Sequence, residues 1–532
     1  MSARTKGVAD REIVVIGAGH NGLAAAIMLA EAGRKVTVLE SNAEPGGAVK
    51  TEEVTLPGFR HDLMATNLNL FMGSAFFAKY EDRLRSHGFD VAHSTRPVCS
   101  LFPNGGYIGV TSDLEETLKS IRAYSNIDAD AFREMRAEFD RIAPHLFPLL
   151  GVPLPSAAAA KRLLTGSRAL GRAWPLELGR LVAQSPRQFV EDHFESPEVQ
   201  SLVAAWGMHL DFAPSVSGGA LFPFLETMAS QANGIVLGAG GAKTMIDAMT
   251  GLLGELGGQL QCDSKVDQVV IEDGKATAVV CADTRYEAGG GVVANLTPTQ
   301  LFERLVDGDH LDKKFRTQVR RFRYGPGTLM VHLALSDLPP WIRTEAQQHT
   351  YVHIAPYLQD MDLAYSQAMA GILPQRPTLV VGQPTVADPS RAPAGKHVLW
   401  VQARMFPKIV SGDGAQEITG TSWEQIKEAV ADRVMAQLEE YAPGLSSNVL
   451  GRHVLSPADL ENSNANLVGG DSLAGSHHIM QNFALRPFPG WSRYRTPIKN
   501  LYMCGASTWP GAGLGAGSGY LVGNLLSSRR RR

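Results

Sequence analysis

The chain has 532 residues, of which 44% are hydrophobic and 19% are charged, a balance typical of a soluble globular protein with a large core. Its 50 Lys and Arg residues nearly match its 53 Asp and Glu residues, so the net charge of −3 excludes a chain-wide basic field for nucleic acid. The four cysteines form no CxxC pair, which argues against a redox-active dithiol and against a disulfide scaffold. Residues 1–12 lack the apolar stretch of a signal peptide, and these features together favour the cytoplasm.

The first readable unit is a strand, a glycine-rich turn, a helix and a second strand. Residues 13–16 are a β-branched run typical of a buried parallel strand, and residues 23–32 favour a helix. Residues 35–39 form a second strand that ends at Glu40. The turn, residues 17–22, reads Gly-Ala-Gly-His-Asn-Gly and has the GxGxxG spacing of a dinucleotide-binding unit.

Each part of this unit has a mechanical reason. Gly17 allows a tight turn, Gly19 lets the backbone approach a pyrophosphate, and Gly22 lets the helix pack against the sheet. The helix N-terminus offers free N–H groups to the pyrophosphate, and Glu40 offers a carboxylate to a ribose hydroxyl. The alternative is a glycine-rich turn in an ordinary α/β unit. The complete order of strand, helix, second strand and terminal Glu favours the dinucleotide.

The unit alone does not separate NAD from FAD. Gly46 and Gly47, soon after Glu40, favour FAD because a further glycine pair can follow the extended diphosphate of that cofactor. His20 lies in the turn and is a tempting acid or base. We expect it to face solvent, since the turn contacts phosphate rather than reacting atoms.

The next part of the chain, residues 101–240, is expected to be mainly helical, with amphipathic helices at 113–123 and 129–142. Residues 151–190 hold six basic side chains and one opposing acid, Glu177, with leucines between them. A basic amphipathic stretch of this kind can lie on an anionic membrane surface. The alternative is a solvated helical face.

A second glycine-rich loop, residues 238–243, resembles a nucleotide loop, but Lys243 replaces its third glycine and no strand with a terminal acid follows. We therefore reject it as a second dinucleotide site. A helix is expected at 244–256, and Asp273-Gly274 predicts a hairpin between strands 266–272 and 275–281. A short strand at 291–294 leads to Asn295 and is expected to return the chain to the first sheet.

Residues 300–490 mix strands, such as 329–335 and 378–382, with a helix near 423–441, and are expected to form a second, substrate-binding domain. We find no internal repeat and no cluster with metal-ligand spacing. His477 and His478 have no partner at i+3 or i+4, which favours a structural role over metal binding.

The glycines concentrate near the C-terminus. The uncharged stretch 500–528 has 29 residues, long enough to span a bilayer, but it contains seven glycines and Pro510. A strand at 501–504, a glycine loop and a helix at 520–526 explain it better than a membrane span. A helix N-terminus in this place could face the pyrimidine edge of a flavin and stabilise negative charge on it.

At residues 500–513, Asn-x-Tyr-Met-x-Gly-Ala-Ser-Thr-x-Pro-Gly-x-Gly resembles the signature of the phytoene desaturase family of FAD oxidoreductases. Trp509 departs from that signature, which usually has a small polar residue or His there. Gly-His-Asn-Gly at 19–22, the turn at 46–48, Pro-Gly-Phe-Arg at 57–60 and the segment 486–498 look most like the branch of pyridine nucleotide-disulphide oxidoreductase domain-containing protein 2. The resemblance spans nearly the whole chain and is thinnest from 100 to 240.

The resemblance implies one non-covalently bound FAD and hydride abstraction from an extended apolar substrate, such as a polyene or isoprenoid. It places Val266 on the adenine side. The residues expected near the adenosine and diphosphate are Gly17, Ala18, Gly19, Asn21, Gly22, Glu40, Ser41, Gly46, Gly47 and Ala48. Those expected near the flavin end are Asn295, Gly505, Ala506, Leu514, Gly515 and Ala516. No catalytic acid or base is identified.

We therefore expect an α/β protein with a Rossmann-type, glutathione-reductase-like FAD-binding domain assembled from residues 1–95, 240–300 and 490–532. A mixed α+β substrate-binding domain with a helical part is expected from residues 96–239 and 301–489. Its function is expected to be desaturation or dehydrogenation of an apolar small molecule. The alternatives are an amine-oxidase-like flavoenzyme and a non-enzymatic prenyl or lipid carrier. Peripheral membrane contact through residues 161–187 and the tail 529–532 is a further expectation, and the oligomeric state stays open.

Overall fold

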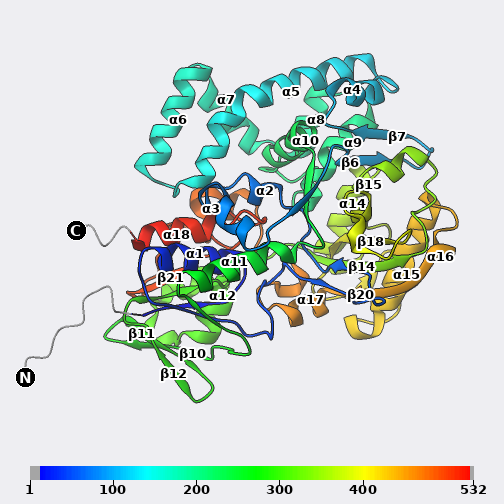
Figure 1. Cartoon of the computed structure of the whole chain (residues 1–532). Coiled ribbons are helices and arrows are strands. Elements are labelled where there is room, and N and C mark those ends of the chain that lie inside the picture. Colours follow the sequence, from blue (N-terminus) through cyan, green and yellow to red (C-terminus); the bar gives the residue numbers. More distant parts are fainter. Residues whose placement is uncertain (1–11, 528–532) are drawn as a thin grey trace, which may run out of the picture.

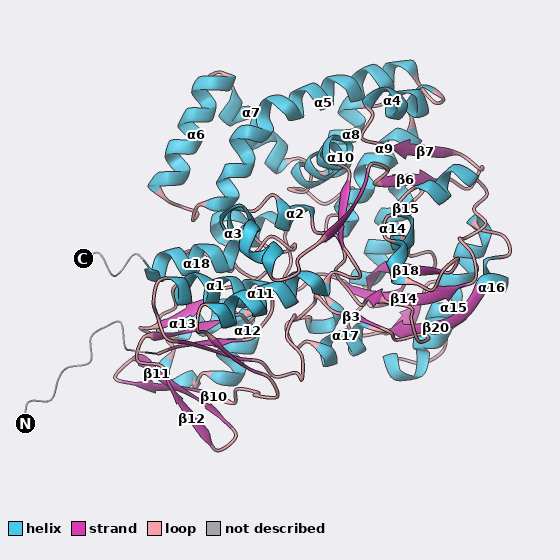
Figure 2. Cartoon of the chain, in the orientation of Figure 1, coloured by secondary structure: helices cyan, strands magenta, loops and turns pink. Residues whose placement is uncertain are grey.

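The computed structural model describes residues 12–527 (Figure 1). The predicted tail, residues 529–532, and nearly all of the segment considered for a signal peptide lie outside this range. Within it the chain folds around two separate sheets, with most of the helices of the 114–233 region gathered in a layer at the top of the view in Figure 2. The interiors of the two halves are distinct apolar clusters, one around the first sheet and one on each face of the second.

The first sheet has five parallel strands in the order β21-β13-β1-β2-β9. Its central strands are short and buried on both faces, as the β-branched sequences predict. The strands are β1 (Ile13–Ile16), β2 (Val36–Leu39), β9 (Gln259–Gln261), β13 (Gly291–Ala294) and β21 (Leu501–Met503). They come from widely separated parts of the chain, which confirms the predicted α/β fold with a discontinuous first domain. The exact boundaries of the two domains stay a prediction.

Two helices on this sheet approach unusually closely. They are α1 (His20–Glu31) and α18 (Gly517–Ser527). A Cβ atom on Gly519 would lie 2.0 Å from the carbonyl oxygen of Asn21, and one on Gly523 would lie 2.4 Å from Cβ of Met28. The glycines of the uncharged C-terminal stretch are therefore needed for helix contact. No helix within residues 12–527 is long and apolar enough to span a membrane.

A three-stranded antiparallel sheet lies beside the first one. Its strands are β10 (Gln268–Glu272), β11 (Lys275–Cys281) and β12 (Thr284–Glu287). Asp273 and Gly274 both have positive φ, 51° and 70°, as a two-residue type I′ hairpin turn requires. The predicted hairpin is confirmed, although its first strand begins two residues later than expected.

The second sheet has seven strands in the order β20-β14-β18-β17-β15-β6-β7. They are β6 (Val98–Leu101), β7 (Tyr107–Val110), β14 (Gly327–Leu335), β15 (Tyr351–Ile354), β17 (Thr378–Gly382), β18 (His397–Phe406) and β20 (Val449–Leu455). One face is covered by α15 (Trp423–Tyr441), whose predicted bounds are confirmed. The other face packs toward the helical layer.

Strands β6 and β7 correct the expectation that residues from 101 onward are mainly helical. They form an antiparallel pair at the edge of the second sheet, joined through Asn104 and Gly105. Asn-Gly is a strong hairpin signal, and Gly105 has the positive φ, 75°, that such a turn favours. The dipeptide therefore predicts this hairpin more reliably than the helical periodicity around it predicts a helix.

The remaining elements complete the two halves. The helices are α2 (Asn69–Met72), α3 (Ala75–Ser86), α4 (Leu114–Arg122), α5 (Asn126–Leu146), α6 (Ala157–Leu170), α7 (Trp174–Ala183), α8 (Pro186–His193), α9 (Pro197–Ala204), α10 (Leu221–Asn233), α11 (Lys243–Glu255), α12 (Pro298–Gln300), α13 (Lys313–Arg320), α14 (Leu358–Met369), α16 (Leu445–Asn448) and α17 (Pro457–Ser463). The short strands are β3 (Thr51–Glu52), β4 (His61–Asp62), β5 (Val91–Ser94), β8 (Ile235–Gly238), β16 (Ile372–Leu373) and β19 (Gly412–Asp413).

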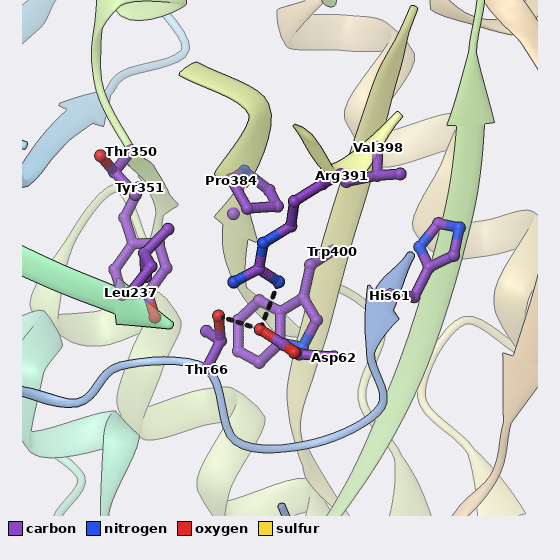
Figure 3. A pocket seen from close by; sticks show the side chains of 11 residues that line it. His61, Asp62, Thr66, Leu237, Thr350, Tyr351, Pro384, Arg391, Val398 and Trp400 are labelled. Carbon is purple, nitrogen blue, oxygen red and sulfur yellow. Dashed lines mark hydrogen bonds and ion pairs between the residues drawn. The ribbon is translucent and has the colours of Figure 1, made fainter. Parts of the chain in front are cut away.

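A buried ion-pair cluster ties the two halves together (Figure 3). Arg391, which has no solvent exposure, donates from Nη1 to Oδ2 of Asp62 at 2.6 Å and from Nε to Oδ2 of Asp388 at 3.1 Å. Its Nη2 donates to the carbonyl oxygen of Gly238 at 2.8 Å. Thr66 donates to the same Asp62 carboxylate, and the adjoining cavity of about 10 Å³ has room for about one water molecule.

We expect Arg391→Met to destabilise the protein strongly, because it leaves two buried carboxylates without their cation. Breaking a buried pair in this way costs about 3–5 kcal/mol of unfolding free energy. The matched control is Arg452→Met, since Arg452 pairs with the exposed Glu428 and Asp432 and such surface pairs contribute about 0–1 kcal/mol. Denaturant unfolding of both variants provides the comparison, and similar losses in the two would contradict the special role of Arg391.

Candidate cofactor site

The turn between β1 and α1 has room for backbone only. Gly17 has φ +91° and donates from its N–H to the carbonyl oxygen of Leu39 at 2.8 Å. A Cβ atom on Gly22 would lie 2.1 Å from the carbonyl oxygen of Gly17. The first and third glycines of the motif are therefore demanded by the fold itself, whatever the turn binds.

The second glycine has a different reason. Gly19 has φ −67°, which any residue tolerates, and it precedes α1 without any side chain capping the helix. An uncapped helix N-terminus leaves N–H groups and partial positive charge available to an anion. The absence of a side chain at Gly19 keeps this end of the helix open.

Glu40 turns back from the end of β2 toward the same turn. Its Oε2 accepts from the N–H of Ala18 at 2.7 Å, and its Oε1 accepts from the N–H of Asn42 and the hydroxyl of Ser41. The backbone of Glu40 also accepts from Ser264 at 2.7 Å, which brings the segment leading to Val266 beside it. The structure thus gathers Ala18, Glu40 and Ser41 in one place, with the segment that contains Val266 alongside.

Gly46 and Gly47 pack against the glycine-rich turn, as their place in the sequence predicted. Gly46 donates from its N–H to the carbonyl oxygen of Ala18 at 3.0 Å and pairs with Gly19 in an isolated parallel bridge. A Cβ atom on Gly47 would lie 3.4 Å from Cα of Gly19. Ala48 follows directly, so these residues extend the backbone-lined surface beyond the turn.

Asn295 joins the two glycine-rich regions. It follows β13, and its Nδ2 lies 2.9 Å from where a Cβ of Gly19 would stand. Its Oδ1 lies 2.5 Å from the corresponding position at Gly505. Asn466, which the sequence did not single out, donates to the carbonyl oxygen of Asn295 at 3.3 Å and accepts from Thr297. Asn466 carried no local signal, because it reaches this place from the other half of the chain.

The C-terminal loop, residues 505–516, is held from several sides. Gly505 donates to the hydroxyl of Ser518 at 3.0 Å, and Ala512 donates to Nε2 of the buried His477 at 2.9 Å. Ala516 has positive φ, 53°, directly before α18 begins. The loop therefore brings Gly505, Ala506, Leu514, Gly515 and Ala516 onto the start of α18, beside the start of α1.

Asn21 links these two helix starts. Its Oδ1 accepts from the N–H of Gly519 at 3.2 Å, and its Nδ2 lies 2.9 Å from Nε2 of His20. Asn21 is buried, so its contacts are structural ones between α1 and α18.

The expectation that His20 faces solvent is wrong. The ring is half-buried beside the C-terminal loop, where it hydrogen-bonds the backbone of Gly513. Burial lowers the pKa of His20 to about 4, so the imidazole is neutral at neutral pH. The sequence prediction failed because the chain segment that covers His20 lies nearly 500 residues away.

Arg486 is a positioning residue that motif resemblance alone left without a role. Its guanidinium donates to the carbonyl oxygens of Gly475, Ser476, Gln481 and Ala506. Burial lowers the pKa of Arg486 to about 10, against the opposing effect of Asp211 and Asp471. The side chain fixes the loop that carries His477 against the C-terminal glycine loop.

The rejected loop, residues 238–243, has its N–H groups occupied by the chain's own side chains. Gly240 donates to Oδ2 of Asp388 at 2.7 Å, and Ala242 donates to Oδ1 of Asp62 at 2.8 Å. Lys243 donates from its backbone to the hydroxyl of Thr51. Two carboxylates and a hydroxyl stand where a phosphate would bind. Among the described residues, no group of three or more His, Cys, Asp or Glu is arranged to hold a metal ion.

Comparison with known proteins agrees with this geometry. The family model described as flavin containing amine oxidoreductase matches residues 22–516. Pyridine nucleotide-disulfide oxidoreductase domain-containing protein 2 of Rattus norvegicus is 28% identical and the match covers 97% of this chain and 93% of that protein. A limonene dehydrogenase of Castellaniella defragrans is 27% identical, with 96% and 93% covered. A lycopene-forming phytoene desaturase of Pseudescherichia vulneris is 24% identical, with 95% and 96% covered.

Solved structures share the fold. An oxidoreductase from Methanosarcina mazei has a TM-score of 0.62 at 18% identity, covering 97% of this chain and 99% of that one. Putrescine oxidase bound to putrescine has a TM-score of 0.58 at 14% identity, covering 98% and 99%. The resemblance to the phytoene desaturases and their relatives is confirmed. The chain belongs to the flavin-containing amine oxidoreductase family and is an FAD-dependent oxidoreductase.

Proposed function

We propose that this protein dehydrogenates or desaturates an extended apolar substrate, with FAD held along the two helix starts that meet at Asn295. The observation that carries the cofactor assignment is this meeting, since one long dinucleotide needs two backbone-lined surfaces in line. Bound FAD supplies the hydride acceptor. Glu40, Gly19 and Gly47 hold the adenosine and diphosphate in this proposal, and Gly505 and residues 514–516 lie along the flavin.

The character of the second sheet supports an apolar substrate. Its face toward the helical layer is rich in large apolar side chains, with Met330, Tyr351, Trp400 and Met405 in one apolar cluster. Tyr351 and Trp400 stack with ring centroids 6.0 Å apart. Arg404, on the same face, donates to three backbone carbonyl oxygens and two hydroxyls, so its charge is already satisfied.

Histidines on this face are also uncharged. Nε2 of His209 lies 3.0 Å from Nε2 of His353, and burial lowers the pKa of His353 to about 3. Limonene and phytoene, named for two relatives, are hydrocarbons, and a neutral aromatic and sulfur-rich lining suits molecules of that class.

One side chain favours amine oxidation as a second candidate. Glu226 on α10 is half-buried, and burial raises its pKa to about 7. It is near enough to Tyr351 that its charge, after burial and with Asp62, raises the pKa of that phenol. A carboxylate beside stacked aromatic rings is the arrangement that an ammonium group would require. We set aside the carrier alternative, because the chain belongs to a family of oxidoreductases.

We expect the purified protein to contain about one FAD per chain and Gly19→Val to lose it. The valine side chain meets Asn295 and fills the space over the helix start, while the φ of Gly19 suits any residue. Gly254→Val is the matched control, since a Cβ at Gly254 meets nothing within 4 Å. Flavin absorbance after gel filtration measures occupancy, and full occupancy in Gly19→Val would falsify the assignment of this turn.

We expect NADH and NADPH not to reduce the bound flavin rapidly, since the second glycine loop is filled by Asp62 and Asp388. Oxygen, a quinone or another acceptor then reoxidises the reduced flavin. Stopped-flow mixing of the oxidised enzyme with micromolar NADH or NADPH checks this. Rapid bleaching of the flavin would show that a nicotinamide site exists elsewhere.

A substrate panel separates desaturation from amine oxidation. Under anaerobic conditions we expect terpene and polyene hydrocarbons, dispersed in detergent, to bleach the flavin and primary amines to leave it oxidised. Glu226→Gln should change hydrocarbon rates less than about threefold, whereas an amine oxidase that uses Glu226 would lose about tenfold or more, the value of one charged hydrogen bond. Bleaching by amines alone, abolished in Glu226→Gln, would reverse the assignment.

A further inference from the structure

Helices α6 and α7 form a hairpin at the edge of the helical layer, beyond α5 (Figure 1). The hairpin closes on Trp174, which is buried, and a Cβ atom on Gly166 would lie 2.6 Å from its ring. This contact lets the two helices pack without their leucines. The side chains on the outer surface of the hairpin are therefore free of any packing role between the helices.

Large apolar side chains lie exposed on this hairpin. Leu176 is 79% exposed, Leu164 is 52% exposed and Leu163 is 37% exposed. Single exposed leucines need no explanation, but three on one short hairpin form a local apolar surface.

Unpaired cations surround these leucines. Lys161, Arg162, Arg168 and Arg172 are exposed, and the described part of the chain provides no ion pair for any of them. The other two basic residues of the segment are neutralised, because Arg180 pairs with Asp192 at 2.8 Å and Arg187 pairs with Asp362 at 2.9 Å. The charge predicted from the sequence is thus concentrated on the α6–α7 hairpin rather than spread along residues 161–187.

We propose that the α6–α7 hairpin docks reversibly on an anionic lipid surface. Bases interleaved with exposed leucines match both parts of such a surface, the negative headgroups and the apolar layer beneath them. A nucleic acid would use the bases and leave the leucines exposed to water. The docking does not depend on which substrate the enzyme oxidises, and its test reads binding rather than turnover.

Helix α13 is the internal comparison. It carries Lys313, Lys314, Arg316 and Arg320, all exposed, while its apolar residues Phe315 and Val319 are buried. It therefore has the charge of the α6–α7 hairpin without the exposed leucines. Attraction by charge alone would involve α13 as much as the hairpin.

The experiment is co-sedimentation of the flavin-loaded full chain with vesicles. Phosphatidylcholine vesicles are compared with vesicles that also contain phosphatidylglycerol, across a salt series. The hairpin variants are K161E/R162E/R168E, which reverses three charges, and L164S/L176S, which removes two leucines. The control K313E/K314E/R316E reverses three charges on α13, and a chain that ends at Ser528 removes residues 529–532, which lie outside the described range. Retained flavin absorbance shows that each variant is folded.

We expect binding to anionic vesicles at low salt, released as salt rises, and a loss of about tenfold or more in the hairpin charge variant. The leucine variant should bind several-fold more weakly, and the α13 control and the shortened chain should bind within about twofold of the original protein. Absence of binding to anionic vesicles at low salt would overturn the proposal. Equal losses in the hairpin and α13 variants, or a loss confined to the shortened chain, would also overturn it.

Discussion

The structure depends on backbone segments that approach one another more closely than any side chain allows. Gly22 lies over the carbonyl oxygen of Gly17, Gly519 lies over that of Asn21, and Gly47 lies over Gly19. These contacts bring two helix starts side by side and leave a surface made of N–H groups, with Glu40 at one end. Because the contacts form without side chains, they supply little hydrophobic burial themselves. The apolar clusters on either side of the first sheet must hold them in place.

Buried charge aligns the two halves. Arg391 joins Asp62 and Asp388 across the interface, and Arg486 joins four carbonyl oxygens around the C-terminal loop. Apolar contacts tolerate small shifts, whereas a guanidinium that donates in fixed directions does not. The cofactor surface and the apolar face of the second sheet thus keep one relative position.

Local signals in the sequence were sufficient for much of the fold. Helix α15 and the hairpin at Asp273-Gly274 were predicted because their periodicity and turn residues are complete within a short window. The same holds for the unit from β1 to Glu40, and the glycines and Asn295 of the site were found from it. Strands β6 and β7 were missed, although Asn104-Gly105 marked their turn.

Other features were out of reach for a physical reason. His20 is covered by Gly513, Asn295 is held by Asn466, and the N–H groups of the second glycine loop are taken by Asp62 and Asp388. Each of these pairs is separated by more than a hundred residues, so no local pattern records it. Charge on residues 161–187 illustrates the same limit, since only the structure shows which cations are paired.

The place of β21 and α18 also constrains how the protein is made. Strand β21 completes the edge of the first sheet beside β13, and α18 packs on α1, which is synthesised nearly 500 residues earlier. During translation the outer edge of β13 and one side of α1 therefore stay uncovered until residues 501–527 have left the ribosome. An exposed edge of a short β-branched strand is a hazard for mispairing while it lasts. Flavin loading is consequently a post-translational event, and a nascent chain of this protein is a natural client for chaperones.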